Sequence, residues 1–137
     1  MNQAVILLAH GARDAAWATP FEAVCARIRE RAPEALVRLA FLELMAPTLE
    51  DAGAELVARG CTRIAVVPAF LGMGGHVRRD VPAQLDALRR AHPAIAWTLH
   101  EALGETPHVI AALADAAVDL AGFGFSRPHD SQDGMAT

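Results

Sequence analysis

The chain has 137 residues, the length of one globular domain, with 53% hydrophobic and 20% charged residues. Its formal net charge of −4 argues against a broad nucleic-acid-binding surface, because such a surface needs an excess of basic residues. Cys25 and Cys61 form no CxxC pair, so we expect reduced thiols and a cytoplasmic protein rather than a disulfide framework. The apolar stretch near the start, Ala4–Ala9, is too short for a signal peptide or a membrane span.

The first predicted strand is Ala4–Ala9, a continuous apolar run typical of a strand buried on both faces. A helix is then predicted to begin at Thr19, with Thr19 as its N-cap and Pro20 in its first position. Glu22 completes a capping box with Thr19. The second strand is predicted at Leu36–Leu42.

The second helix is predicted from Pro47 to Gly60, since glycine commonly follows a helix end. The third strand is predicted at Ile64–Phe70. Pro68 lacks a ladder donor, so the strand is expected to end or bulge there. A glycine-rich loop, Leu71–His76, follows.

The third helix is predicted to begin around Asp80–Pro82, and the fourth strand at Ile95–Leu99. The fourth helix is predicted from Thr106 to Gly122. This alternation predicts an α/β fold: a single-domain, open, mainly parallel four-stranded sheet flanked by helices, like half of a flavodoxin-like domain. Residues 1–125 are expected to form this domain, and residues 126–137, a polar segment, a disordered tail.

Three residues with metal-binding side chains follow successive predicted strands. His10, Glu43 and His76 are spaced 33 residues apart, about one strand–helix unit each. Parallel strands deliver their carboxyl ends to one edge of a sheet, where ligands bind. Two imidazoles and a carboxylate at that edge predict a site for a divalent transition metal. Taken singly, each also fits a structural role: a hydrogen-bonded histidine, a solvated carboxylate or a residue of a flexible loop.

Basic residues accompany both histidines. Arg13 follows His10 in the sequence, and Arg78 and Arg79 follow His76. On an acidic protein this cluster indicates anionic groups on the ligand, because arginine pairs with carboxylates. The alternative is a solvated surface on which these arginines pair with neighbouring aspartates.

The remaining histidines and tryptophans carry weaker signals. His100 and His108 flank the segment after the fourth strand, so they either approach the same edge or lie on the surface. Trp17 and Trp97 are interpreted as packing residues, and Trp17 can also border the cleft.

Three segments resemble one enzyme family. They are LLAHGARD at 7–14, AFLELMAPTL at 40–49 and VVPAFLGMGGHVRRDVP at 66–82. Together they are similar to the small, single-domain sirohydrochlorin chelatases, which are class II chelatases, and the resemblance covers roughly residues 3–121. Ala12 stands where the family usually has serine. The segment Trp97–Pro107 also diverges, lacking the usual proline before Leu103-Gly104.

The resemblance implies a chelatase-like fold and a lyase that inserts a divalent metal into sirohydrochlorin, in cobalamin or sirohaem biosynthesis. The metal substrate would be Co²⁺ or Fe²⁺, with Ni²⁺ a further candidate, and no organic cofactor is implied. His10 and His76 match the family's metal-site histidines and would also take protons from the substrate, and Glu43 matches their acidic partner. The family's small members typically form homodimers.

The carboxylate-rich tetrapyrrole gives the neighbouring residues a role in substrate binding. We assign five residues to it, the arginines as partners of its carboxylates and the glycines as space for a flat macrocycle: Arg13, Gly74, Gly75, Arg78 and Arg79. No nucleic-acid or membrane partner is expected.

Two other functions stay open at this point. A metal- or tetrapyrrole-carrying protein without turnover would keep the same histidines. A flavodoxin-like binder of phosphate or nucleotides is disfavoured, because the serine- and threonine-containing phosphate loop is missing after the first strand. The glycine-rich loop is also no P-loop, since it contains no serine, threonine or lysine.

Overall fold

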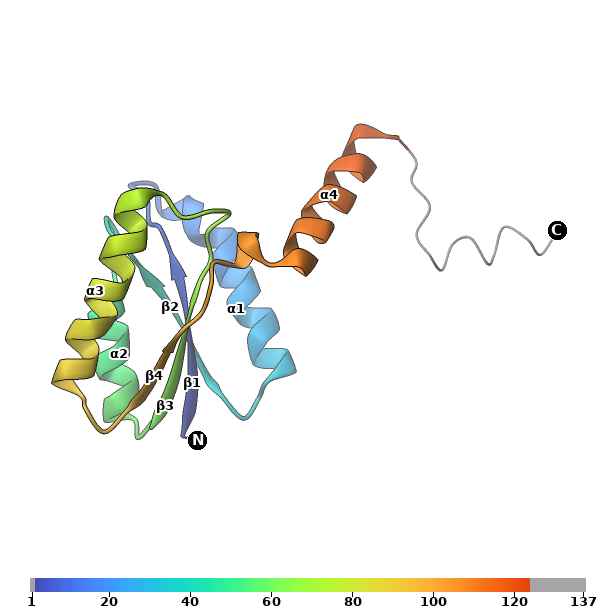
Figure 1. The fold of residues 1–137 in the computed structure, drawn as a ribbon. Coiled ribbons are helices and arrows are strands. Elements are labelled where there is room, and N and C mark those ends of the chain that lie inside the picture. The colour runs from blue at the N-terminus through green and yellow to red at the C-terminus, as the bar shows by residue number, and fades with distance from the viewer. Residues whose placement is uncertain (1, 124–137) are drawn as a thin grey trace. The chain divides into compact units, whose positions relative to one another are not determined.

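The computed structural model describes residues 2–123, and these fall into two compact units, 2–104 and 105–123. The first unit holds a four-stranded, all-parallel sheet in the order β2-β1-β3-β4 (Figure 1). The strands are β1 (Gln3–Ala9), β2 (Leu36–Phe41), β3 (Arg63–Pro68) and β4 (Ala96–Leu99).

Helices alternate with these strands along the chain. A 3₁₀ turn η1 (Ala15–Ala18) runs directly into α1 (Thr19–Arg31), and a second 3₁₀ turn, η2 (Leu103–Glu105), follows β4. The other helices are α2 (Leu49–Ala58), α3 (Gly75–Ala91) and α4 (Pro107–Ala121). In the first unit, α1 covers one face of the sheet, and α2 and α3 cover the other (Figure 1).

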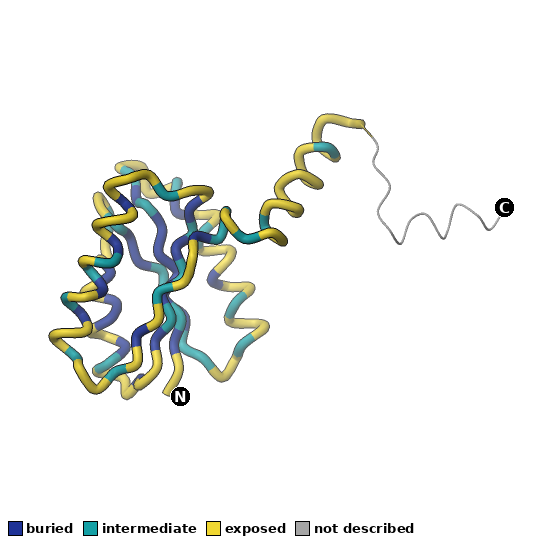
Figure 2. The backbone as a smooth tube through the Cα atoms, viewed as in Figure 1, coloured by how far each residue is buried: buried dark blue, intermediate teal, exposed yellow. Residues whose placement is uncertain are grey.

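The buried residues of β1 alternate between two apolar clusters. Ile6 and Leu8 pack with α2 and α3, whereas Leu7 packs with Cys25 of α1. Because successive side chains of a strand point to opposite faces, a continuous apolar run lets β1 contribute to both layers. Figure 2 shows this buried centre with the exposed helix surfaces around it.

The predicted parallel α/β fold is confirmed, and each strand lies within two residues of its predicted bounds. β3 ends at Pro68, where the missing ladder donor was expected to end it. Both cysteines are free and buried. None of the helices between residues 2 and 123 combines the length and the apolar character that crossing a membrane requires. The predicted tail, 126–137, lies outside the described residues.

The predicted N-cap of the first helix is wrong. Thr19 has helical backbone angles (φ −53°, ψ −47°), and Ala18 precedes α1 without a side-chain cap. The reason is η1, which supplies a helical turn before Thr19, so that a side-chain cap is needed one turn earlier. Asp14 meets that need, since its side chain accepts a hydrogen bond from the Ala16 amide at 2.9 Å.

The predicted start of the third helix is also wrong, because α3 begins at Gly75 and contains Pro82 in its interior. An interior proline costs a helix a hydrogen bond. Here the apolar stripe continues past it towards the N-terminus, with Val77 and Val81 both buried against the sheet. Burial of these side chains offsets the cost, and His76 therefore lies in the first turn of a helix.

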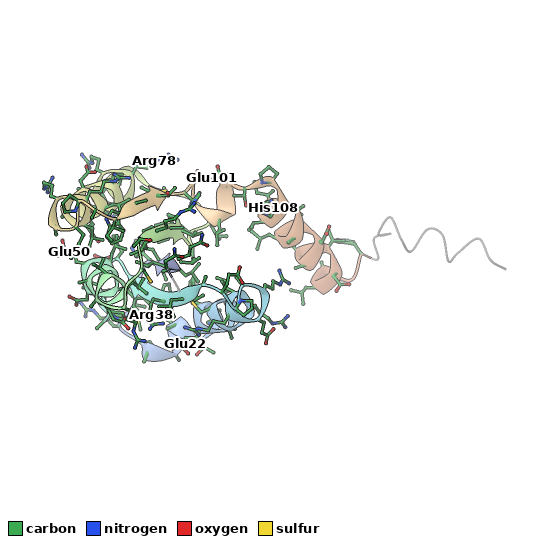
Figure 3. All side chains as sticks on the ribbon, turned by 90° about the horizontal axis from the view of Figure 1, so that it is seen from below. Glu22, Arg38, Glu50, Arg78, Glu101 and His108 are labelled. Atoms are coloured by element: carbon green, nitrogen blue, oxygen red, sulfur yellow. The ribbon has the colours of Figure 1, made fainter. Side chains whose placement is uncertain are left out.

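One ion pair links β2 to α2. Arg38 holds Glu55 through hydrogen bonds of 3.0–3.1 Å, and Arg59 adds a further one (Figure 3 labels Arg38). The hydrogen bonds from Arg38 lower the pKa of the Glu55 carboxyl below its ordinary value. The ionised carboxylate thus stabilises the folded state above the pKa that glutamate has in the unfolded chain.

Glu55→Gln should lower the free energy of unfolding at pH 7 by less than about 1 kcal/mol, since the pair is partly exposed to solvent. The difference from the unsubstituted protein should vanish as the pH falls through the lowered pKa of Glu55, because protonated Glu55 is then as uncharged as the glutamine that replaces it. Urea unfolding at several pH values measures this difference. Glu30→Gln, at an exposed position of α1, is the control, and a Glu55→Gln penalty that persists at the lowest pH would contradict the assignment.

Candidate functional site

Strand register brings His10 beside Glu43. The pairing of β1 with β2 continues past both strand ends, because the Leu42 amide donates to the Ala9 carbonyl at 2.9 Å and the Glu43 amide to the His10 carbonyl at 3.1 Å. The side chains then meet, with His10 Nε2 lying 3.3 Å from Glu43 Oε1. Both remain accessible, at 42% and 53% exposed.

Gly11 makes this approach possible. Its backbone has φ +102°, a conformation that favours glycine. A Cβ at Gly11 would also overlap the backbone carbonyl oxygen of Glu43. Glycine after His10 is therefore required both by the backbone angle and by the close passage of the loop that carries Glu43.

The third strand end completes one wall of the site. The Ala69 amide donates to the Leu8 carbonyl at 2.7 Å, which carries the β1–β3 pairing on towards Phe70. The rings of His10 and Phe70 meet edge to face, with centroids 5.9 Å apart. The His10 ring thus contacts both the Phe70 ring and the Glu43 carboxylate.

His76 reaches the same place from α3. It follows Gly75, the first residue of α3, and is exposed. His76 and His10 both line one pocket of about 480 Å³, within the range of small-molecule sites. Apolar side chains dominate the rest of its lining, which consists of Trp17, Phe21, Ala69, Phe70, Leu71, Gly72, Gly74 and Val77.

The glycines of the preceding loop leave space rather than supply an unusual backbone. Gly74 has φ −70°, and neither Gly72 nor Gly75 lies in the positive-φ region. A Cβ at any of the three would meet no atom within 4 Å. The backbone beside His76 is consequently open to a ligand.

Of the other predicted site residues, Gly74 lines this pocket, and the rest are not among its lining residues. Glu43 contacts His10 but does not line the cavity. Arg13, Arg78 and Arg79 are exposed, and Arg78 Nε donates to the Met73 carbonyl at 2.9 Å, so this arginine also holds the loop (Figure 3). Among residues 2–123, no three histidine, cysteine or acidic side chains are grouped closely enough to hold a metal ion by themselves.

His100 lies apart from the pocket. It lines a separate groove on the sheet, together with Val5, Ala65 and Thr98. His108 belongs to the second unit, on α4.

Sequence reasoning missed two aromatic residues of the pocket. Phe21 was assigned no role in the site, and Phe70 was interpreted only as a strand residue. The register of β3 against β1 places Phe70 opposite His10, but that register follows from the structure and not from the residue pattern. Trp17, which was expected to pack and was able to border the cleft, does both.

Comparisons with known proteins converge on one family. The model of the CbiX family matches residues 4–120. A crystal structure of a CbiX protein from Marinobacter aquaeolei VT8 is 32% identical and has a TM-score of 0.77, covering 89% of this chain and 99% of that one. A second structure is that of the sirohydrochlorin chelatase SirB from Bacillus subtilis subspecies spizizenii, solved in complex with cobalt. It is 28% identical and has a TM-score of 0.74, and the match covers 88% of this chain and 52% of SirB.

A curated relative is longer than this chain. The sirohydrochlorin ferrochelatase of Priestia megaterium is 27% identical over an alignment 142 positions long, gaps included, which covers 95% of this chain and 53% of that protein. The chain thus spans about half the length of the curated relatives it matches.

Proposed function

Because the chain belongs to the CbiX family, we propose that it is a sirohydrochlorin chelatase, a lyase that inserts Co²⁺ or Fe²⁺ into sirohydrochlorin in cobalamin or sirohaem biosynthesis. The observation that carries the proposal is that His10 and His76, from two different elements, line one open pocket. The cobalt complex of SirB and the ferrochelatase of Priestia megaterium support these two metals as the substrate.

Metal insertion replaces two pyrrole N–H protons of the macrocycle with one divalent metal ion. The protein must therefore present the metal with open coordination positions and supply bases for two protons. A neutral imidazole can do either task, because it titrates near neutral pH and is a common metal ligand. We assign both tasks to His10 and His76, with metal coordination completed by the substrate or by water.

Glu43 gives His10 a defined role. When His10 carries its proton on Nε2, which faces Glu43 Oε1 at 3.3 Å, its Nδ1 is left as the ligand or proton acceptor. When His10 has taken a proton, the same carboxylate balances the imidazolium charge. Glu43 thus supports His10 in both states, and it can also ligate the metal directly.

The surroundings of the pocket fit a large, flat, anionic substrate. Gly72 and Gly74 leave the backbone open where the macrocycle would enter, with Gly75 next to them. We assign Arg13, Arg78 and Arg79, all exposed, to the carboxylates at the edge of the tetrapyrrole.

The protein acts as a homodimer in this proposal. Two copies would supply the length of one curated relative, of which this chain spans about half. Within the first unit, no helix covers the groove on the α1 face along β3 and β4. Ile110 and Leu113 of α4 are 52% and 48% exposed. Such apolar surfaces mark sites of protein–protein contact.

A double substitution Ile110→Glu/Leu113→Glu should convert the dimer to a monomer at micromolar concentration, since charges would then have to be buried in the interface. Light scattering measures the mass. His108→Glu is the control, because His108 shares the opposite, polar face of α4 with Asp115 and Asp119 at helical spacing, so that a glutamate is added to α4 outside the apolar face. A monomer mass for the unsubstituted chain at high micromolar concentration would refute the dimer.

A turnover experiment separates the enzyme from the carrier alternative. The protein is mixed anaerobically with a tenfold excess of sirohydrochlorin and Co²⁺, and the tetrapyrrole absorbance is followed. A chelatase converts the whole pool, whereas a carrier binds one equivalent and stops.

A further inference from the structure

Trp17 is fixed in place immediately after the His10 loop. The Trp17 amide donates to the Asp14 carbonyl at 3.1 Å, and the Asp14 side chain caps the same turn. Its neighbour Ala18 is buried, in a cluster with Ala9 and Phe41 at the ends of β1 and β2. The indole is therefore held by the strand ends that also position His10.

The indole is only half buried, although it packs against the apolar cluster that contains Phe41. Its ring packs on Phe21, with centroids 4.6 Å apart and ring planes inclined by 37°. The two rings line the pocket together with His10 and His76. A large aromatic surface is thus left open to the pocket and is supported by contact with a second ring.

We propose that Trp17, supported by Phe21, is the wall against which the flat face of the tetrapyrrole lies during metal insertion. This inference rests on the proposed function and names a binding residue within it. A conjugated macrocycle carries its carboxylates on its periphery and presents apolar faces, and aromatic rings bind such faces in offset or tilted stacks. The wall therefore contributes to substrate affinity, and the two histidines carry the chemistry.

Trp17→Ala should weaken binding of metal-free sirohydrochlorin about tenfold, raising Kd and KM by similar factors while kcat changes little. Trp17→Phe should keep Kd within about threefold, because it retains an aromatic face. Trp17→Leu, which keeps apolar bulk against Phe21 without a ring, should weaken binding at least about fivefold. Binding is measured by absorbance titration, and circular dichroism verifies the fold of each variant.

Val24→Ala is the control, because Val24 is an exposed apolar residue of α1 outside the pocket. A folded Trp17→Leu variant that binds sirohydrochlorin as tightly as the unsubstituted protein would overturn the proposal. So would a loss of kcat rather than of affinity. If the unsubstituted protein itself binds no tetrapyrrole, the proposed function fails as well, which distinguishes the two failures.

Discussion

Replacing His76 with alanine should lower kcat for metal insertion by at least about 100-fold, the range expected when a proton-transferring group is removed. His10→Ala should have an effect of similar size, because each imidazole supplies either a ligand or a base that the other cannot replace. The fold should survive both changes, since His76 is exposed and His10 is only partly buried. Initial rates against substrate concentration, with circular dichroism, measure both.

His108→Ala is the matched control, because this exposed histidine of α4 is not among the lining residues of the pocket and should leave the rate unchanged. Activity of the unsubstituted enzyme should also fall with decreasing pH, because an imidazolium can neither ligate a metal nor accept a proton. A folded His76→Ala variant with near-normal kcat and KM would remove His76 from the mechanism.

Gly11→Ala should be the most disruptive single-methyl change in the site. The added Cβ meets the Glu43 carbonyl and forces an alanine into φ +102°, so we expect a loss of about 2–4 kcal/mol in the free energy of unfolding. The loop that carries Glu43 should also move away from His10, and metal insertion should slow.

Gly60→Ala isolates the steric part of this effect. Gly60 has a similar angle, φ +92°, but no atom lies within 4 Å of its added Cβ. Its substitution should cost only about 1 kcal/mol, the conformational penalty alone. Urea unfolding of the two variants gives the difference, and equal penalties would show that the close passage of Glu43 past Gly11 is unimportant.

The strand pattern predicted the sheet, because short, continuous apolar runs that alternate with helices are typical of parallel strands buried on both faces. It also predicted that His10 and Glu43 would share an edge, since parallel strands end together, and their side chains do meet. The pattern did not predict the start of α3. Pro82 is a local helix-breaking signal, and burial of Val77 and Val81, which overrides it, depends on tertiary packing.

Trp17 was expected to be able to border the cleft, but the roles of Phe21 and Phe70 in the pocket could not be predicted from the sequence, for a related reason. Phe70 faces His10 through the β1–β3 register, and Trp17 faces the pocket because η1 follows the His10 loop. Neither register nor a 3₁₀ turn leaves a clear periodicity. Gly11 was visible as a glycine after a histidine, but the contact that requires it, with Glu43, comes from a loop 32 residues away in the sequence.

The most direct test of the central claim is the rate of sirohydrochlorin metallation by the purified chain under anaerobic conditions. Co²⁺ and Fe²⁺ are tested separately against the uncatalysed background, with the double variant His10→Ala/His76→Ala at equal concentration. The proposal predicts multiple turnovers with at least one of the two metals and a background rate for the double variant. Equal rates for the chain and the double variant, or no rate above background with either metal, would contradict it.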